Sequence, residues 1–130
     1  MPTLKVSVIG LRGHAQNHIQ SLLNHEDVTV SVLYHKVVPE SYTHLHITDK
    51  IDDCMNSDAI IISSPTDSHY DYMMSLLDFP GYILLEKPAV NTAEQIEVLT
   101  QLPDHIKSRT RINFNFNFHK INSILEDLVQ

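Results

Sequence analysis

Residues 5–15 read KVSVIGLRGHA, an apolar run that passes into a glycine-containing turn and then into a helical pattern. The run Leu4–Ile9 is rich in Val and Ile, which predicts a strand buried on both faces of a sheet. Further apolar runs follow at Val28–Leu33, Asp58–Ile62 and Tyr82–Leu85. Helical patterns alternate with these runs, which predicts a parallel sheet with right-handed crossovers. We therefore expect one α/β domain, with a doubly wound, mostly parallel sheet in a three-layer α/β/α arrangement.

The remaining elements follow from periodicity and from turn residues. Helical spacing predicts helices at Ala15–Asn24, Tyr70–Leu77, Ala93–Leu102 and Lys120–Val129, with one short helical turn at Lys50–Met55. Strict alternation predicts a half-exposed last strand at Arg109–Phe118, and a short strand is predicted at His44–Ile47. Thr92 and Gln95 match a capping box, which starts a helix that Pro103 ends.

Length and composition limit the class of protein. The chain has 130 residues, of which 42% are hydrophobic, so it can bury the core of one ordinary domain. The formal net charge of −7 and the scattered basic residues argue against nucleic-acid binding. The single cysteine, Cys54, excludes an internal disulfide and favours a reducing compartment. Because the apolar runs are too short to span a membrane and the N-terminus lacks a signal peptide, we expect a cytoplasmic protein without a membrane partner.

Nine histidines raise the question of a metal site. His14 and His18 are four residues apart, a spacing that can bind a metal on one face of a helix. His44 and His46 would share one face of a short strand. Neither pair has a nearby cysteine or an obvious acidic third ligand. We therefore predict solvated or locally hydrogen-bonded histidines and no metal site.

The turn after the first strand partly matches a dinucleotide-binding fingerprint. Such a turn needs one glycine for the tight bend, a second where the backbone approaches a pyrophosphate, and a third small residue for helix packing. Gly10 and Ala15 fit the first and third positions, whereas Arg12 occupies the second, where its Cβ would intrude on the phosphate. We expect Gly13, one residue further on, to provide that close approach. The turn alone is a weak signal, because glycine-rich turns between a strand and a helix are common.

The second strand ends without an acidic residue, in the sequence Leu33-Tyr34-His35-Lys36. An Asp or Glu at this place would accept hydrogen bonds from the ribose hydroxyls of NAD, whereas a cation favours the 2′-phosphate of NADP. Lys36, with His35 or Arg12, can supply that cation. Two interpretations stay open here: a site that slightly favours NADP over NAD, and a surface on which the adenosine site is degraded.

Two later apolar runs also end in polar, turn-forming residues. The run Ala59–Ile62 is followed by Ser63-Ser64-Pro65-Thr66 and then by His69. The run Tyr82–Leu85 continues into Glu86-Lys87-Pro88. Because the carboxyl ends of the strands form the ligand crevice of an open α/β sheet, these motifs and the glycine turn should meet at one edge. That edge is the candidate site.

The whole pattern, over roughly Leu4 to His119, resembles the glucose–fructose oxidoreductase / inositol dehydrogenase family (Gfo/Idh/MocA). The resemblance implies a Rossmann domain at residues 1–119 that binds NADP or NAD, from an oxidoreductase that transfers hydride on a sugar or cyclitol. It implies that Lys87 is catalytic, because an ammonium there can polarise an oxygen beside the nicotinamide. With the end of the second strand included, the predicted cofactor-binding residues are Gly10, Leu11, Arg12, Gly13, His14, Ala15, His35, Lys36, Ser64, Pro65, Thr66, His69, Glu86 and Pro88.

Members of the family carry a second domain, which holds the substrate and an acid–base pair. The chain ends where that domain would begin, with a helix expected at residues 120–130. We therefore expect the chain alone to bind a dinucleotide without measurable turnover. The departures from the fingerprint at Arg12 and Tyr34 support an alternative, in which a non-catalytic Rossmann module with a degraded cofactor site serves in assembly or regulation.

The last strand carries a second expectation. Large apolar side chains alternate along it, at Ile112, Phe114, Phe116 and Phe118. A large uncovered apolar face usually marks an interface, so we expect a two-fold homodimer, which sedimentation would test.

Overall fold

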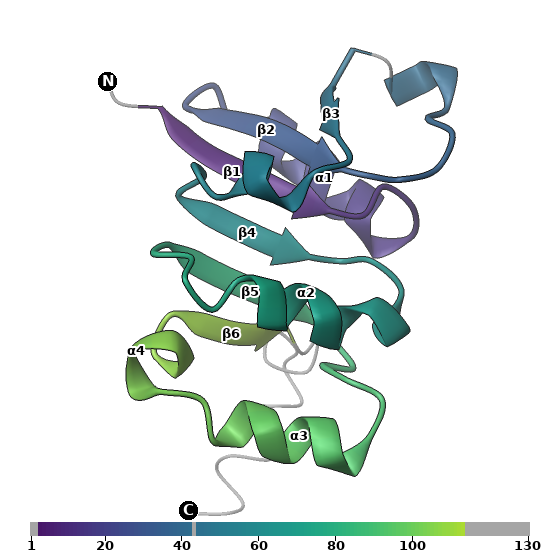
Figure 1. The fold of residues 1–130 in the computed structure, drawn as a ribbon. Coiled ribbons are helices and arrows are strands. Elements are labelled where there is room, and N and C mark those ends of the chain that lie inside the picture. The colour runs from purple at the N-terminus through teal and green to yellow at the C-terminus, as the bar shows by residue number, and fades with distance from the viewer. Residues whose placement is uncertain (1–2, 43, 114–130) are drawn as a thin grey trace, which may run out of the picture.

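A computed structural model describes residues 3–42 and 44–113 of the chain. In this part, six strands form one sheet in the order β3-β2-β1-β4-β5-β6 (Figure 1). The strands are β1 (Leu4–Ile9), β2 (Val28–Leu33), β3 (His46–Thr48), β4 (Ala59–Ile62), β5 (Tyr82–Glu86) and β6 (Thr110–Asn113). All neighbouring strands are parallel, which confirms the predicted doubly wound α/β fold.

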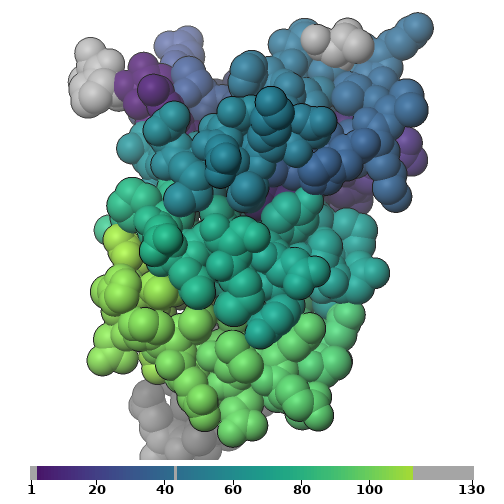
Figure 2. Space-filling view, in the orientation of Figure 1, coloured from purple at the N-terminus to yellow at the C-terminus, as the bar shows by residue number. Residues whose placement is uncertain are grey.

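Helices cover both faces of this sheet. They are α1 (His14–Leu23), α2 (His69–Ser75), α3 (Ala93–Thr100) and α4 (Asp104–Lys107). In Figure 1, α1 lies behind the sheet, whereas α2 lies in front of it. Figure 2 shows the front face, where the first part of the chain occupies the upper half and the later part the lower half. The domain therefore consists of two βαβ halves side by side, as expected for a doubly wound fold.

Two hydrophobic cores hold the helices to the sheet. Side chains of β4 point alternately to the two faces of the sheet and so contribute to both cores. Ile60 and Ile62 pack into the core on the α2 face, and Ile61 packs into the core on the α1 face. On the α1 face, Ala15 and Ile19 of α1 are fully buried. Each fully buried aliphatic side chain of this size stabilises the fold by about 1.5–3 kcal/mol. The saturated Val and Ile runs of the central strands are thus explained by burial on both faces.

The register of the central strands positions the candidate site. Ile9, the last residue of β1, pairs with Leu33 of β2 on one side and with Ile62 of β4 on the other. Ile62 in turn pairs with Leu85 of β5. Four strands therefore end at nearly one level, and the residues that follow them are brought together at one edge.

The structure shifts some of the predicted bounds. The short strand β3 begins at His46, so His44 lies before it, and the expected helical turn is a 3₁₀ turn at Ile51–Cys54. Thr92 caps α3 as predicted, because its Oγ1 accepts a hydrogen bond from the Gln95 backbone N–H at 3.1 Å. The Gln95 side chain accepts from the backbone N–H of the preceding residue, Asn91, at 3.2 Å, instead of from Thr92.

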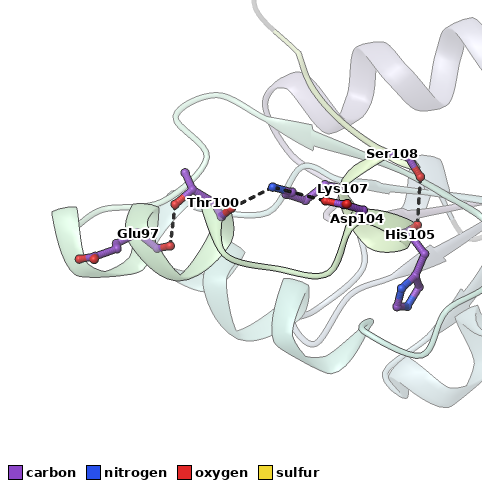
Figure 3. Close-up of polar contacts among 6 residues, drawn as sticks. All are labelled: Glu97, Thr100, Asp104, His105, Lys107 and Ser108. Carbon is purple, nitrogen blue, oxygen red and sulfur yellow. Dashed lines mark hydrogen bonds and ion pairs between the residues drawn. The ribbon is translucent and has the colours of Figure 1, made fainter.

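A short helix, α4, follows α3 and was not predicted. α3 ends at Thr100, two residues before the expected end at Leu102, and Pro103 is the N-cap of α4. Lys107 Nζ donates to the carbonyl oxygen of Thr100 at 3.0 Å and lies 3.9 Å from a carboxylate oxygen of Asp104 (Figure 3). These contacts link the last turn of α3 to α4. Asp104 in the first turn and Lys107 in the last turn also suit the helix dipole. This charge pattern is visible in the sequence and could have indicated the helix.

Several predictions fall on residues beyond the described part. The expected strand continues past Asn113, and the expected helix Lys120–Val129 and the three phenylalanines of the apolar face lie outside the described residues. Ile112, the described member of that face, is 37% exposed. The homodimer therefore stays a prediction. In the described ranges, the helices are all too short or too polar to cross a membrane.

Candidate functional site

A cavity of about 500 Å³ opens at the carboxyl ends of β1, β2, β4 and β5. Its walls are formed by Ile9, Gly10, Leu11, Arg12, Gly13, His14, Leu33, Tyr34, His35, Lys36, Ser63, Ser64, Pro65, Thr66, Ser68, His69, Tyr72, Glu86 and Lys87. The cavity lies between β1 and β4, where the strand order reverses, and this is where open α/β sheets bind ligands. Of the residues predicted for the site, only Ala15 and Pro88 do not line it.

Gly10 begins the turn after β1 and can only be a glycine. Its φ is +119°, and a Cβ at this position would lie 2.6 Å from the carbonyl oxygen of Ser63. Its N–H donates to the carbonyl oxygen of Leu33 at 3.0 Å. Gly10 therefore joins the ends of β1, β2 and β4 and leaves their common edge open.

Gly13 precedes α1 and serves a different purpose. Its φ is +63°, yet a Cβ there would meet nothing within 4 Å, so open space faces it. No side chain caps the N-terminus of α1. Backbone N–H groups at the start of a helix favour an anion, and an open approach beside a glycine permits one to come close. Ala15 is fully buried between α1 and the sheet, which is the packing role of the third fingerprint position.

At the β2 end of the cavity, the residues that depart from the fingerprint contact each other. Arg12 Nε donates to the hydroxyl of Tyr34 at 3.0 Å. Beside them, His35 Nε2 and the hydroxyl of Tyr72 form a hydrogen bond at 3.1 Å. Burial, with a smaller effect of Cys54, raises the pKa of Tyr72 above its usual value. Tyr34 and Tyr72 were missed as site residues, because their partners lie far away in the sequence.

At the other end, His69 connects two loops. Its side chain is only 1% exposed. Nε2 lies 2.7 Å from the carbonyl oxygen of Ser64, and Nδ1 lies 3.0 Å and 3.2 Å from those of Pro88 and Ala89. These oxygens only accept, so the donor is whichever ring nitrogen carries a hydrogen, and a neutral imidazole has one such N–H. His69 therefore ties the loop after β4 to the loop after β5, which brings Pro65 and Lys87 to the same end of the cavity.

The three residues of the Glu86-Lys87-Pro88 motif have different surroundings. Glu86 is buried at the end of β5, and its Oε1 forms an ion pair with Nε2 of His18 on α1. Lys87 is exposed and lines the cavity. Pro88 follows a cis peptide bond and lines a separate apolar hollow beneath α3. His18 is thus the partner of the first residue of the motif.

A search of the described ranges for a metal site finds no group of three His, Cys, Asp or Glu side chains that could hold a metal ion.

The charge and polarity of the cavity suit an anionic dinucleotide. Three cationic side chains line it, Arg12, Lys36 and Lys87, although the whole chain has a net charge of −7. Glu86 is the one carboxylate among the described lining residues, and it is paired with His18. In addition, the buried hydroxyl of Ser63 has no hydrogen-bond partner among the described residues. An open glycine edge, an excess of positive charge and a buried unpartnered hydroxyl together fit a polar, phosphate-bearing ligand.

Known structures with the same fold are much longer proteins. The myo-inositol 2-dehydrogenase from Lactobacillus plantarum is 18% identical, with a TM-score of 0.77 over 98% of this chain and 41% of that chain. UDP-N-acetylglucosamine 3-dehydrogenase GnnA from Acidithiobacillus ferrooxidans is 18% identical, with a TM-score of 0.74 over 98% and 44%. GenD2 from gentamicin A biosynthesis, solved in complex with NAD, is 18% identical, with a TM-score of 0.74 over 98% and 39%. The chain thus spans about two fifths of the length of these structures.

At these identities the likeness shows the fold alone. No curated protein matches the chain in sequence. The sequence model of the Gfo/Idh/MocA oxidoreductases, described as an oxidoreductase family with an NAD-binding Rossmann fold, matches residues 4–114. This match covers most of the chain and confirms the resemblance inferred from its motifs. The chain therefore belongs to the Gfo/Idh/MocA oxidoreductase family, and residues 4–114 form the NAD-binding Rossmann domain of that family.

Proposed function

We propose that the chain binds a nicotinamide dinucleotide in the cavity and acts as the cofactor-binding domain of an oxidoreductase. The reaction we propose is hydride transfer between the cofactor and the alcohol or ketone of a sugar or cyclitol. One observation carries the proposal: a single cavity at the switch point of the sheet is lined by the glycine turn, by the cations at its β2 end and by Lys87. The myo-inositol and amino-sugar dehydrogenases of the same fold support the substrate class by analogy.

The residues have separate tasks in this proposal. Gly13 and the first N–H groups of α1 hold the pyrophosphate. Ser64, Pro65 and Thr66 contact the nicotinamide ribose, and Lys87 hydrogen-bonds the oxygen of the reacting alcohol or ketone. The bound dinucleotide supplies the hydride chemistry, while the protein positions it. We expect turnover to need acid–base groups beyond those that the described residues place here, because positioning supplies up to about 7–11 kcal/mol of such catalysis.

We further propose that NADPH binds more tightly than NADH. The β2 end of the cavity carries Tyr34 where an acidic residue would select the ribose of NAD. Arg12 and Lys36 line the same end and can meet a 2′-phosphate. A charge-assisted contact contributes about 1.5–3 kcal/mol, which corresponds to tenfold or more in affinity. GenD2, a protein of the same fold, was solved in complex with NAD, so the preference has to be measured on this chain.

Titration of the purified chain with NADPH and NADH tests both parts of the proposal. We expect NADPH to bind roughly tenfold more tightly, and Lys36→Ala to remove most of that difference. Lys50→Ala is a matched control, since Lys50 is also exposed but lies outside the cavity. Equal affinities, or tighter NADH, would refute the preference. Absence of binding by either form would refute the proposed function.

One observation favours a second candidate, a non-catalytic module with a degraded cofactor site. Arg12 stands at the fingerprint position where a glycine is usual, and its Nε is already engaged by Tyr34. If this hydrogen bond closes the β2 end, neither dinucleotide binds. The same titration therefore separates the two candidates.

A further inference from the structure

A second hollow, mostly apolar, lies beneath α3, and we call it the α3 hollow. It holds about 490 Å³, and side chains of α2, β5, α3 and β6 line it, among them Met73, Leu85, Ile96, Leu99 and Ile112. The hollow is open, since Ile96 is 53% exposed and Ile112 is 37% exposed. Apolar surface that gathers in one exposed place usually marks an interaction site.

The burial of α3 also indicates that this surface has room for a partner. Within the described structure, no residue of α3 is buried, whereas α1 buries Ala15 and Ile19. Short helices in proteins derive most of their stability from packing an apolar face. A segment that packed against Ile96 and Leu99 would therefore give α3 the cover that α1 already has.

The described part of the chain ends beside the α3 hollow. Ile112 lines the hollow, and Asn113 is the last described residue. Residues 114–130 follow, and their sequence carries apolar residues at helical spacing, namely Ile121, Ile124, Leu125 and Leu128. Residues 114–119 can span up to about 20 Å, so residues 120–129 are within reach of the hollow.

Charge and attachment favour this segment over a second copy of the chain, which is the occupant that the expected homodimer would supply. Lys107 lines the hollow, whereas Glu126 and Asp127 make the segment acidic. A segment attached through a short connection has an effective concentration in the millimolar range, which a second copy in dilute solution does not reach. Two copies, each with a net charge of −7, also repel each other.

We propose that the segment Lys120–Val129 of this chain docks as an amphipathic helix in the α3 hollow, with its apolar residues against α3 and β6. The inference does not depend on dinucleotide binding, yet it bears on the candidate site. Pro88 and Ala89 also line the hollow, and their carbonyl oxygens contact His69. The docked segment therefore packs against the loop that follows Lys87 and supports it from outside the cavity.

Hydrogen exchange of the full chain, followed by mass spectrometry, tests the docking. Ile96→Asp places a charge in the wall of the hollow, at an exposed position that the fold can tolerate. We expect amide exchange in residues 121–129 to accelerate by roughly tenfold or more, because the docked state loses the burial of one large apolar side chain. Val98→Asp is the matched control. Val98 is also an exposed residue of α3 but is not among the described residues that line the hollow, so exchange should stay unchanged.

A substitution in the segment itself provides the reciprocal test. Leu125→Asp should accelerate exchange in α3, whereas Ser123→Asp, on the opposite side at helical spacing, should not. Because residues 120–129 lie after the sheet in the chain, neither variant alters the described core, which circular dichroism checks.

Three outcomes would overturn the inference and leave the proposed function untouched. The first is exchange of residues 121–129 in the unsubstituted chain at the rate of an unfolded peptide. The second is equal acceleration in Ile96→Asp and Val98→Asp. The third is a sedimentation profile in which the unsubstituted chain is a dimer and Ile96→Asp is a monomer, since the hollow would then hold a second copy.

Discussion

The two ends of the cavity are held together in different ways. At the β4–β5 end, a fully buried imidazole, His69, bridges two loops through three backbone carbonyl groups. At the β2 end, the Arg12–Tyr34 hydrogen bond joins two side chains at the surface. Buried polar contacts are costly to break, whereas exposed ones contribute little to stability. The comparison teaches that contacts at the β4–β5 end help to hold the fold together, whereas residues at the β2 end can vary at little cost in stability, as their proposed role in cofactor preference requires.

Gly10 contacts both ends of the cavity, so we expect its substitution to have the largest effect on stability. Gly10→Ala would place a methyl group 2.6 Å from the Ser63 carbonyl oxygen, at a φ of +119° that side chains rarely adopt. We expect a loss of about 3 kcal/mol or more in the free energy of unfolding, measured by urea denaturation. Gly13→Ala is the control, because it strains φ without a clash, and should cost about 1–2 kcal/mol. Equal losses would show that the contact with Ser63 does not matter.

His69→Ala separates the two ends directly. It removes a buried ring that contacts three carbonyl oxygens, and with it the N–H that donates to them. We expect a loss of about 2–3 kcal/mol in the free energy of unfolding. His35→Ala removes an exposed imidazole from the β2 end and should cost less than about 0.5 kcal/mol. A similar loss in both variants would remove the distinction that we draw between the ends.

Arg12→Ala tests whether a residue at the β2 end affects cofactor affinity without affecting stability. Its hydrogen bond to Tyr34 is exposed, so we expect the free energy of unfolding to change by less than about 0.5 kcal/mol. The affinity for NADPH should nevertheless fall by roughly fivefold, with little change for NADH, because only NADPH carries the 2′-phosphate. Paired denaturation and titration experiments measure both quantities. A large loss of stability with unchanged affinities would reverse the roles of the two ends.

Much of the fold could be predicted because its signals are local. The saturated run Leu4–Ile9 and its counterpart Val28–Leu33 match β1 and β2 residue for residue. The N-cap at Thr92 was also predictable, since a side chain and a backbone group three residues apart decide it. The short helix Asp104–Lys107 was missed, because the preceding proline was taken only as the end of α3.

The sequence predicted where the candidate site lies, but not which side chains contact each other there. Polar residues after parallel strands must gather at one edge, so Pro65 and Lys87 were expected near the glycine turn, and they line one cavity with it. Their roles in binding and catalysis stay predictions. Ala15 lies in the core, as the packing position of the fingerprint requires, and Pro88 lines a neighbouring apolar hollow, so neither lines the cavity itself.

The sequence by itself determined the order of the strands and of the longer helices as far as Asn113, the family and the edge on which the motifs meet. Only the tertiary structure decided which side chains pair there. His18 and Glu86 are 68 residues apart, and Arg12 and Tyr34 are 22 apart. Hydrophobic periodicity and capping depend on neighbours within a few residues, so one sequence reveals them. Pairing over long separations depends on strand order, crossover and register, which bring residues together only after the sheet has formed.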